Sequence, residues 1–160
     1  LSIFLKVIKD FGITDWKLIL IGNGPIKEDL MHAYKSEYVI FKDFFQPADL
    51  VEEIKNAGFY CLPSKFEAWG VVVQEMAAAG LPLICSDLIG SAESFLKNNV
   101  NGYIFKIDDE KSLYDIIKKV VTKLSDSDLR NMGKESIKLS KSITPEKSVD
   151  ELLKKIDKWY

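Results

Sequence analysis

The sequence predicts an α/β fold in which helices wind around both faces of a mostly parallel sheet. Three observations lead to this prediction. Strand-like and helix-like patterns alternate along the chain, the strand-like segments are short apolar runs, and no internal repeat interrupts them. Continuous apolar runs are typical of strands buried on both faces of a parallel sheet, and helices form the crossovers between such strands. The 160 residues, 47% hydrophobic, suffice for a single domain over residues 1–160 with one core.

The first part of the chain contains three helix patterns and three strand patterns. Apolar side chains recur at helical spacing from Leu1 to Phe11, and Gly12 follows as a stop signal. A GNGP turn leads from the first strand into a helix that we expect to start at Pro25, because proline fits the first helical position. We expect strands at 16–22, 38–41 and 58–63, and helices at 1–11, 25–37 and 47–57.

The second part continues the alternation and closes with helices. Asp108 or Asp109, Ser125 and Thr144 precede amphipathic segments and are candidates for N-caps. The NNVNG segment predicts a turn, since Asn and Gly tolerate positive φ angles. We expect strands at 81–86 and 103–107, and helices at 71–79, 91–98, 108–124, 125–142 and 144–160, the last of which ends in Trp159 and Tyr160.

Composition excludes several classes of function. The formal net charge is −2 and the basic residues are scattered, which argues against a nucleic-acid partner. Cys61 and Cys85 each lie in an apolar run, so we expect buried free thiols in a reducing cytoplasm. Neither a membrane span nor a signal peptide is present in the sequence, and the chain begins at Leu1 within a helix pattern, which we interpret as an excised fragment.

Residues 61–80, CLPSKFEAWGVVVQEMAAAG, contain the strongest candidate site. A strand is followed by a loop with Glu67 and by a helix start at Gly70, whose free amides favour an anion. The helix segment is almost wholly apolar, so we expect it to be buried on most sides and Glu75 to be a poorly paired acid. Ligands of such sheets bind beyond the carboxyl ends of the strands, where this loop lies.

The pattern P-S-x-x-E-x-x-G-x-x-x-x-E, followed by small residues, G-x-P and a strand, resembles the signature of retaining GT-B glycosyltransferases of the group-one (family-four) type. Glu67 and Glu75 match the E-x7-E motif of that family. The resemblance runs from about Gly22 to the C-terminus and covers the Rossmann-like, C-terminal half that binds the donor nucleotide. It implies transfer of a sugar, with retention, from a UDP- or GDP-type nucleotide sugar, without a metal or another cofactor.

The resemblance also implies roles for individual residues. Glu67 is the catalytic candidate and contacts the hydroxyls of the transferred sugar, while Glu75 accepts hydrogen bonds from the ribose hydroxyls. The other donor-binding candidates of this segment are Trp69, Gly70, Val71 and Val72. The sequence reads E-A-W-G where E-G-F-G is usual, so Trp69 changes the volume beside the sugar. Alternatively, Gly70 is a plain helix cap and Glu67 a solvated loop carboxylate.

A second set of candidates lies near the first two strands. In the family, the G-x-G-P turn approaches the nucleotide, and the loop that usually reads F-L-G-F holds the base through main-chain atoms. These patterns imply donor contacts by Gly22, Asn23, Gly24, Lys42, Asp43, Phe44 and Leu50. A tight turn and a plain loop are the structural alternatives, because the third glycine of G-x-G-x-x-G falls at Lys27 and Asp43 replaces the glycine of F-L-G-F.

Other requirements of the reaction lie outside this chain. The resemblance implies that an absent N-terminal domain, with the first strand and a basic Arg and Lys pair for the diphosphate, binds a glycan, lipid or small-molecule acceptor. Any membrane association would come from that half, and the protein would be cytoplasmic or peripheral to the membrane. The alternatives are another GT-B-like enzyme, such as a nucleotide-sugar epimerase or a phosphorylase, and a non-catalytic nucleotide-binding module. The sequence identifies neither the sugar, the base, the acceptor nor the oligomeric state.

Overall fold

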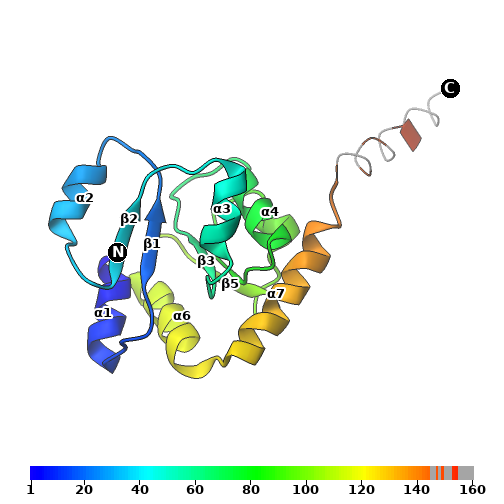
Figure 1. The fold of residues 1–160 in the computed structure, drawn as a ribbon. Coiled ribbons are helices and arrows are strands. Elements are labelled where there is room, and N and C mark those ends of the chain that lie inside the picture. Colours follow the sequence, from blue (N-terminus) through cyan, green and yellow to red (C-terminus); the bar gives the residue numbers. More distant parts are fainter. Residues whose placement is uncertain (145–146, 148, 150–152, 155–160) are drawn as a thin grey trace. The chain divides into compact units, whose positions relative to one another are not determined.

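A computed structural model describes residues 1–144, 147, 149, 153 and 154. Helices and strands alternate through this part of the chain, as the sequence predicts (Figure 1). The chain divides into two compact units. The first comprises Leu1–Asn56 and Asp108–Leu124, and the second comprises Ala57–Ile107 and the chain from Ser125 onward.

The first unit has a core between two helices and a two-stranded parallel sheet. Its elements are α1 (Ser2–Phe11), β1 (Leu18–Ile21), α2 (Lys27–Ala33), β2 (Val39–Lys42), α3 (Pro47–Ile54) and α6 (Glu110–Lys123). Strands β1 and β2 pair in parallel, with Leu18 opposite Val39. Helix α1 packs beside α6 (Figure 1), and Phe4, Val7 and Ile117 are buried between them. Gly12 ends α1 in the left-handed conformation, with φ of 61°, which confirms the expected stop.

Two expectations for this unit are wrong in detail. Helix α2 begins at Lys27 rather than at Pro25, because the first helical hydrogen bond runs from Leu30 to the carbonyl of Ile26. Strand β1 was expected to be buried on both faces. In the structure only one of its faces is covered, since Ile19 and Ile21 are exposed and alternate with half-buried leucines.

The second unit is a three-stranded parallel sheet with helices against it. Its elements are β3 (Tyr60–Leu62), α4 (Val71–Ala78), β4 (Leu83–Ser86), α5 (Ala92–Phe95), β5 (Gly102–Phe105) and α7 (Asp126–Ser140). Strand β4 lies between β3 and β5, and all four of its residues are buried. Helix α7 packs against α4. It also approaches the turn at Gly80 so closely that a Cβ on Gly133 would lie 2.1 Å from the carbonyl oxygen of Gly80.

The predicted α/β class with parallel strand pairing is confirmed. Backbone hydrogen bonds join β1 to β2 in the first unit and β3 to β4 to β5 in the second. Two predicted N-caps are also confirmed. The Asp109 side chain accepts a hydrogen bond from the Ser112 amide, and Ser125 forms a reciprocal capping box with Asp128.

Both cysteines are free thiols, as predicted, but only Cys85 is buried and Cys61 is half-buried. Burial raises the pKa of each thiol to about 12. Cys61 is opposite Ile84, and Leu62 is opposite Cys85. Because successive residues of a strand point to opposite faces, the two thiols lie on opposite faces of the sheet and are not placed to form a disulfide.

The predicted closing helix at 144–160 falls mostly outside the described residues, as do Trp159 and Tyr160. At its start, the amide of Lys147 donates to the Thr144 hydroxyl oxygen at 3.3 Å, the hydrogen bond expected of an N-cap threonine.

Candidate functional site

The loop that carries Glu67 joins β3 to α4 and is bonded to the loop that follows β4. The Glu67 amide donates to the Leu88 carbonyl at 3.3 Å, and the Gly90 amide donates to the Glu67 carbonyl at 3.1 Å. These bonds form a short parallel bridge between Glu67 and Ile89. The backbone of Glu67 is therefore held through both its amide and its carbonyl, although it lies outside the regular strands.

Further hydrogen bonds secure the two ends of this loop. The Ser86 hydroxyl donates to the Ser64 carbonyl at 2.6 Å. At the other end, the Ser91 hydroxyl donates to the Gly70 carbonyl at 2.9 Å, and the Ser91 amide donates to the Trp69 carbonyl at 2.8 Å. Trp69 also packs edge-on against Phe95, with ring centroids 6.2 Å apart. Sequence reasoning missed both serines as parts of the site.

Two glycines allow the loops to approach each other and the helix. Gly70 has a φ of 82°, and a Cβ there would lie 2.9 Å from Cγ of Glu67. A Cβ on Gly90 would lie only 2.2 Å from the carbonyl oxygen of Ala68. Any other residue at these positions would strain the backbone or push the loops apart. The side chain of Glu67 consequently lies against Gly70, the residue that precedes α4.

Helix α4 presents its amino-terminal end next to this side chain. Gly70 is the N-cap, and its carbonyl accepts a hydrogen bond from the Val73 amide at 3.0 Å. Within the part of the chain that the structure describes, the amides of Val71 and Val72 have no hydrogen-bond partner. Free amides and the positive end of the helix dipole make this end attractive to an anion.

The expectation that α4 is buried on most sides is wrong. Val73, Met76 and Ala77 are buried, but Val71 is 58% exposed and Glu75 is exposed. A period of 3.6 residues places the first three side chains on one face of the helix and the other two on the opposite face. Glu75 is therefore a solvated acid in this structure and not a buried one.

The two glutamates are brought toward a common neighbour. The pKa of the Tyr60 hydroxyl is raised, chiefly by burial. The two cysteines raise this pKa further, and the charges of Glu75 and Glu67 make smaller contributions in the same direction. Both carboxylates therefore lie within electrostatic range of one hydroxyl at the start of β3. Among the described residues, neither carboxylate has a hydrogen bond or an ion pair. Both acids are thus available to a ligand.

In the first unit, the structure joins the GNG turn to the loop after β2. The Gly22 amide donates to the Lys42 carbonyl at 3.1 Å. The Lys27 ammonium group donates to Asn23 Oδ1 at 3.1 Å, to the Lys42 carbonyl at 3.3 Å and to Asp43 Oδ1 at 2.6 Å. Lys27 was not a predicted site residue, and its place in the G-x-G-x-x-G pattern is the one sequence signal that distinguished it.

The remaining predicted residues of this unit differ in exposure. The Lys42 side chain forms an ion pair with Glu53 and lies over the Phe45 ring at 6.0 Å, so its charge is already paired. Phe44 is 65% exposed and Leu50 is half-buried. The predicted residues thus form two sets, one in each unit.

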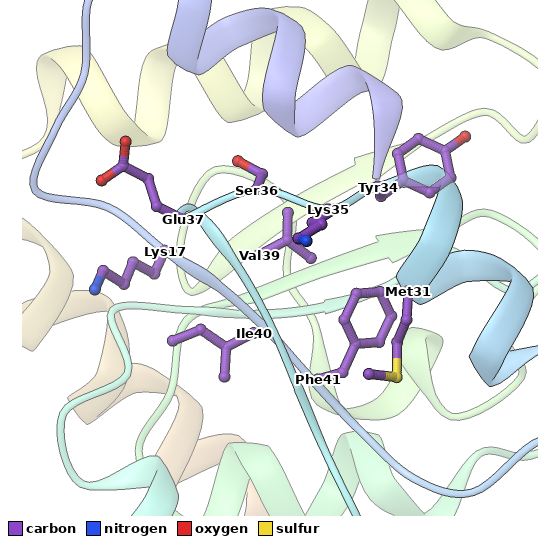
Figure 2. A pocket seen from close by; sticks show the side chains of 9 residues that line it. All are labelled: Lys17, Met31, Tyr34, Lys35, Ser36, Glu37, Val39, Ile40 and Phe41. Atoms are coloured by element: carbon purple, nitrogen blue, oxygen red, sulfur yellow. The ribbon is translucent and has the colours of Figure 1, made fainter.

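A cavity of about 410 Å³ in the first unit contains none of the predicted site residues. Figure 2 shows the side chains around it. They belong to Lys17, Met31, Tyr34, Lys35, Ser36, Glu37, Val39, Ile40 and Phe41. Lys17, Ser36 and Glu37 precede β1 and β2, whereas the GNG turn and the 42–44 loop follow the carboxyl ends of these strands. The candidate site is therefore defined by its loops and not by this cavity.

The described residues contain no group of three or more His, Cys, Asp or Glu side chains placed to hold a metal ion. They also contain no helix that combines the length and the apolar character needed to cross a membrane.

Comparison with known proteins identifies related sequences. The family model described as "Glycosyl transferases group 1" matches residues 1–139. A sulfoquinovosyl transferase of Arabidopsis thaliana is 26% identical over 130 residues, which are 80% of this chain and 25% of the plant protein. A UDP-Gal:alpha-D-GlcNAc-diphosphoundecaprenol alpha-1,3-galactosyltransferase of Escherichia coli is 24% identical over 117 residues, which are 71% of this chain and 30% of that enzyme. The chain thus spans less than a third of the length of these relatives.

A solved structure confirms the fold. The pneumococcal O-GlcNAc transferase GtfA, solved in complex with UDP and GlcNAc, superposes with a TM-score of 0.75 and is 17% identical. The match covers 98% of this chain and 32% of the transferase chain. At this identity the likeness shows the fold alone, a Rossmann-like half of a GT-B enzyme.

Proposed function

The chain belongs to the group 1 glycosyl transferases, and from this membership we propose that it is the donor-binding half of a retaining glycosyltransferase. The donor would be a nucleoside-diphosphate sugar. Displacement at the anomeric carbon would release the nucleoside diphosphate, so the protein must stabilise the charge that develops on the leaving group. We propose that this requires no metal ion.

The observation that carries the proposal is the environment of Glu67. Its backbone amide and carbonyl are both bonded to the 87–91 loop, while its carboxylate has no partner among the described residues. A carboxylate accepts hydrogen bonds from hydroxyl groups and cannot donate when ionised. A fixed backbone with a free acceptor suits the recognition of neighbouring sugar hydroxyls, and this is the role we assign to Glu67.

The start of α4 supports a place for the diphosphate. The amides of Val71 and Val72 point beyond the helix end and would donate to phosphate oxygens, with Gly70 allowing close approach. Val71 and Glu75 are four residues apart, so they share one face of the helix and are separated by about 6 Å along its axis. A nucleotide with its phosphate at the helix start could therefore reach Glu75 with its ribose. Trp69 would flank the sugar.

The relatives narrow the class of donor. The name of the Escherichia coli relative specifies UDP-Gal, and the pneumococcal structure contains UDP. We propose a UDP- or GDP-type sugar as the donor. The family resemblance also implies donor contacts by Gly22, Asn23, Gly24, Lys42, Asp43, Phe44 and Leu50, and we propose these residues as nucleotide-binding candidates. We assign acceptor binding and the basic pair for the diphosphate to residues outside these 160. We also propose that the protein is located in the cytoplasm.

Calorimetric titration of the full-length protein tests the proposal. UDP, GDP and ADP are titrated with and without EDTA, followed by the corresponding nucleotide sugars. We expect at least one nucleoside diphosphate to bind with the same affinity in both conditions. Binding that appears only with Mg²⁺ or Mn²⁺ would refute the metal-free mechanism, and an absence of nucleotide binding would refute the donor site.

The stereochemistry and the reaction are tested separately. Nuclear magnetic resonance of the product should show the anomeric configuration of the donor. Nucleotide binding by a full-length protein that transfers no sugar to any of a panel of glycan and lipid acceptors would favour the non-catalytic module instead.

A further inference from the structure

Two buried serines form hydrogen bonds to the two ends of the loop that carries Glu67. Ser86, the last residue of β4, and Ser91, at the start of α5, are both 0% exposed. Their hydroxyls donate to the carbonyls of Ser64 and Gly70, at 2.6 and 2.9 Å. The two acceptors lie three residues on either side of Glu67. The hydroxyl bonds therefore hold both ends of the loop, while the backbone bonds of Glu67 hold its middle.

The bond made by Ser91 differs from the usual behaviour of serine at this position. Ser91 is the N-cap of α5, where a serine side chain ordinarily accepts a hydrogen bond from the first turn of the helix. Here the side chain makes no capping bond and donates instead to Gly70, a residue 21 positions earlier. The hydroxyl thus connects the starts of two helices, α5 and α4.

The carbonyl that Ser91 contacts belongs to the N-cap of α4. The side chain of Glu67 lies against the same residue, because Cγ of Glu67 is 2.9 Å from the position of a Gly70 Cβ. The Ser91 hydroxyl is therefore bonded to the residue against which the Glu67 side chain lies. At the other end of the loop, where the chain leaves β3, the Ser86 hydroxyl is bonded to Ser64.

We propose that Ser86 and Ser91 are positioning residues, which hold the Glu67 carboxylate and the α4 amino terminus in the relative placement that the donor requires. This inference rests on the proposed function, because it assigns the sugar to Glu67 and the diphosphate to α4. Without either hydroxyl, one end of the loop is released while every donor-contacting side chain remains. A small misplacement of a catalytic group lowers the rate strongly even when binding survives.

The test compares Ser86→Ala and Ser91→Ala with Ser136→Ala in the full-length protein. Ser136 is a matched control, since it is also 0% exposed and hydrogen-bonded, but its partner is Asn101. We expect all three variants to lose a comparable amount of stability. Only the two loop variants should lower kcat, by about 10-fold, with a change in KM for the nucleotide sugar of less than about 3-fold.

A second readout needs no donor and reports on the loop directly. Amide hydrogen exchange at Glu67, Gly90 and Ser91 should become about 10-fold faster in the loop variants and remain unchanged in Ser136→Ala. If an alanine variant fails to fold, Ser86→Cys and Ser91→Cys keep a comparable volume and replace the strong donor by a weak one. They should show the same faster exchange.

The outcomes separate this inference from the proposed function. A wild-type protein that binds no nucleotide sugar would refute the proposed function, and the exchange measurement would still decide whether the serines hold the loop. Loop variants that match Ser136→Ala in kcat and in amide exchange would overturn the positioning role, while leaving the donor site intact.

Discussion

Lys27 donates to Asp43 across 2.6 Å, and each of these residues occupies a position where a glycine-rich pattern has glycine. Lys27 takes the place of the third glycine of G-x-G-x-x-G, and Asp43 that of the glycine of F-L-G-F. The two residues that depart from the patterns are therefore bonded to each other in the structure. Their ion pair ties the GNG turn to the loop after β2, and Lys27 adds bonds to Asn23 and to the Lys42 carbonyl.

A double-mutant cycle should detect this pair. We expect Lys27→Ala and Asp43→Ala to show a coupling in the free energy of unfolding of at most about 1 kcal/mol. The value is modest because the Asp43 side chain is 81% exposed, although that of Lys27 is only 20% exposed. Urea denaturation of the two single variants and the double variant provides the measurement.

The pair between Lys55 and Glu52 is the control for this cycle. Its side chains are 56% and 71% exposed and lie within one helical turn. We expect a coupling of about 0.3 kcal/mol or less there. If the Lys27 and Asp43 cycle shows no more coupling than the control, the two departures do not stabilise each other.

The contact between α7 and the Gly80 turn leads to a prediction about Gly133. Alanine favours a helix over glycine by about 1 kcal/mol, so Gly133→Ala would be stabilising on an exposed helix. Here the added Cβ would lie 2.1 Å from the Gly80 carbonyl oxygen. We expect this clash to dominate and the variant to lose about 1–3 kcal/mol of unfolding free energy.

Asn131, on the same helix and exposed, is the matched control. Asn131→Ala should be neutral or slightly stabilising, because alanine is the better helix former. A Gly133→Ala variant that is as stable as wild type would mean that α7 does not approach Gly80 as closely as the structure shows.

The capping box of α7 leads to a prediction about pH. Hydrogen bonds from the Ser125 hydroxyl and amide lower the pKa of Asp128. A carboxyl whose pKa is lower in the folded state stabilises the protein at pH values above its unfolded pKa of about 3.9, and this contribution is lost as the pH falls through the folded pKa. The stability difference between wild type and Asp128→Asn should therefore be full near neutral pH and disappear in acid.

Asp126→Asn serves as the comparison, because Asp126 lies in the same first turn and makes no side-chain hydrogen bond among the described residues. Thermal unfolding of all three proteins from about pH 7 to pH 2 gives the profiles. Equal pH dependence in the two variants would show that the capping box does not hold the Asp128 charge.

Periodicity was sufficient to predict the elements of this fold. The caps at Gly12, Asp109 and Ser125 are local features, since each depends on residues within four positions along the chain, and they were predicted correctly. The burial of α4 was predicted wrongly, because a run of valine and alanine was interpreted as a helix without an exposed face. Small apolar side chains are tolerated in solvent, so apolar content alone did not identify the buried face.

The contacts that hold the candidate loops were beyond prediction for a different reason. The hydroxyl of Ser86 bonds a carbonyl 22 residues away, and Lys27 bonds a carboxylate 16 residues away. Backbone carbonyls are present at every residue, so a pattern of side chains does not reveal which one a buried serine will contact. The motif predicted Glu67 as a site residue, but only the folded loops show what positions it.

The proposed roles of Glu67 and Glu75 can be distinguished by testing an alanine variant of each against two ligands, the bare nucleoside diphosphate and the nucleotide sugar. If Glu75 accepts the ribose hydroxyls, Glu75→Ala should weaken both ligands; if Glu67 accepts the sugar hydroxyls, Glu67→Ala should weaken only the nucleotide sugar. Hydrogen bonds to a charged group contribute about 1.5–3 kcal/mol, so each loss should be about 10- to 150-fold in Kd.

Neither variant should change the unfolding free energy by more than about 0.5 kcal/mol, because Glu75 is exposed and neither carboxylate has a described partner. Calorimetry on the full-length protein supplies the four dissociation constants. Equal losses of bare nucleotide affinity in both variants would refute the division of roles, even though the chain remains a group 1 glycosyl transferase.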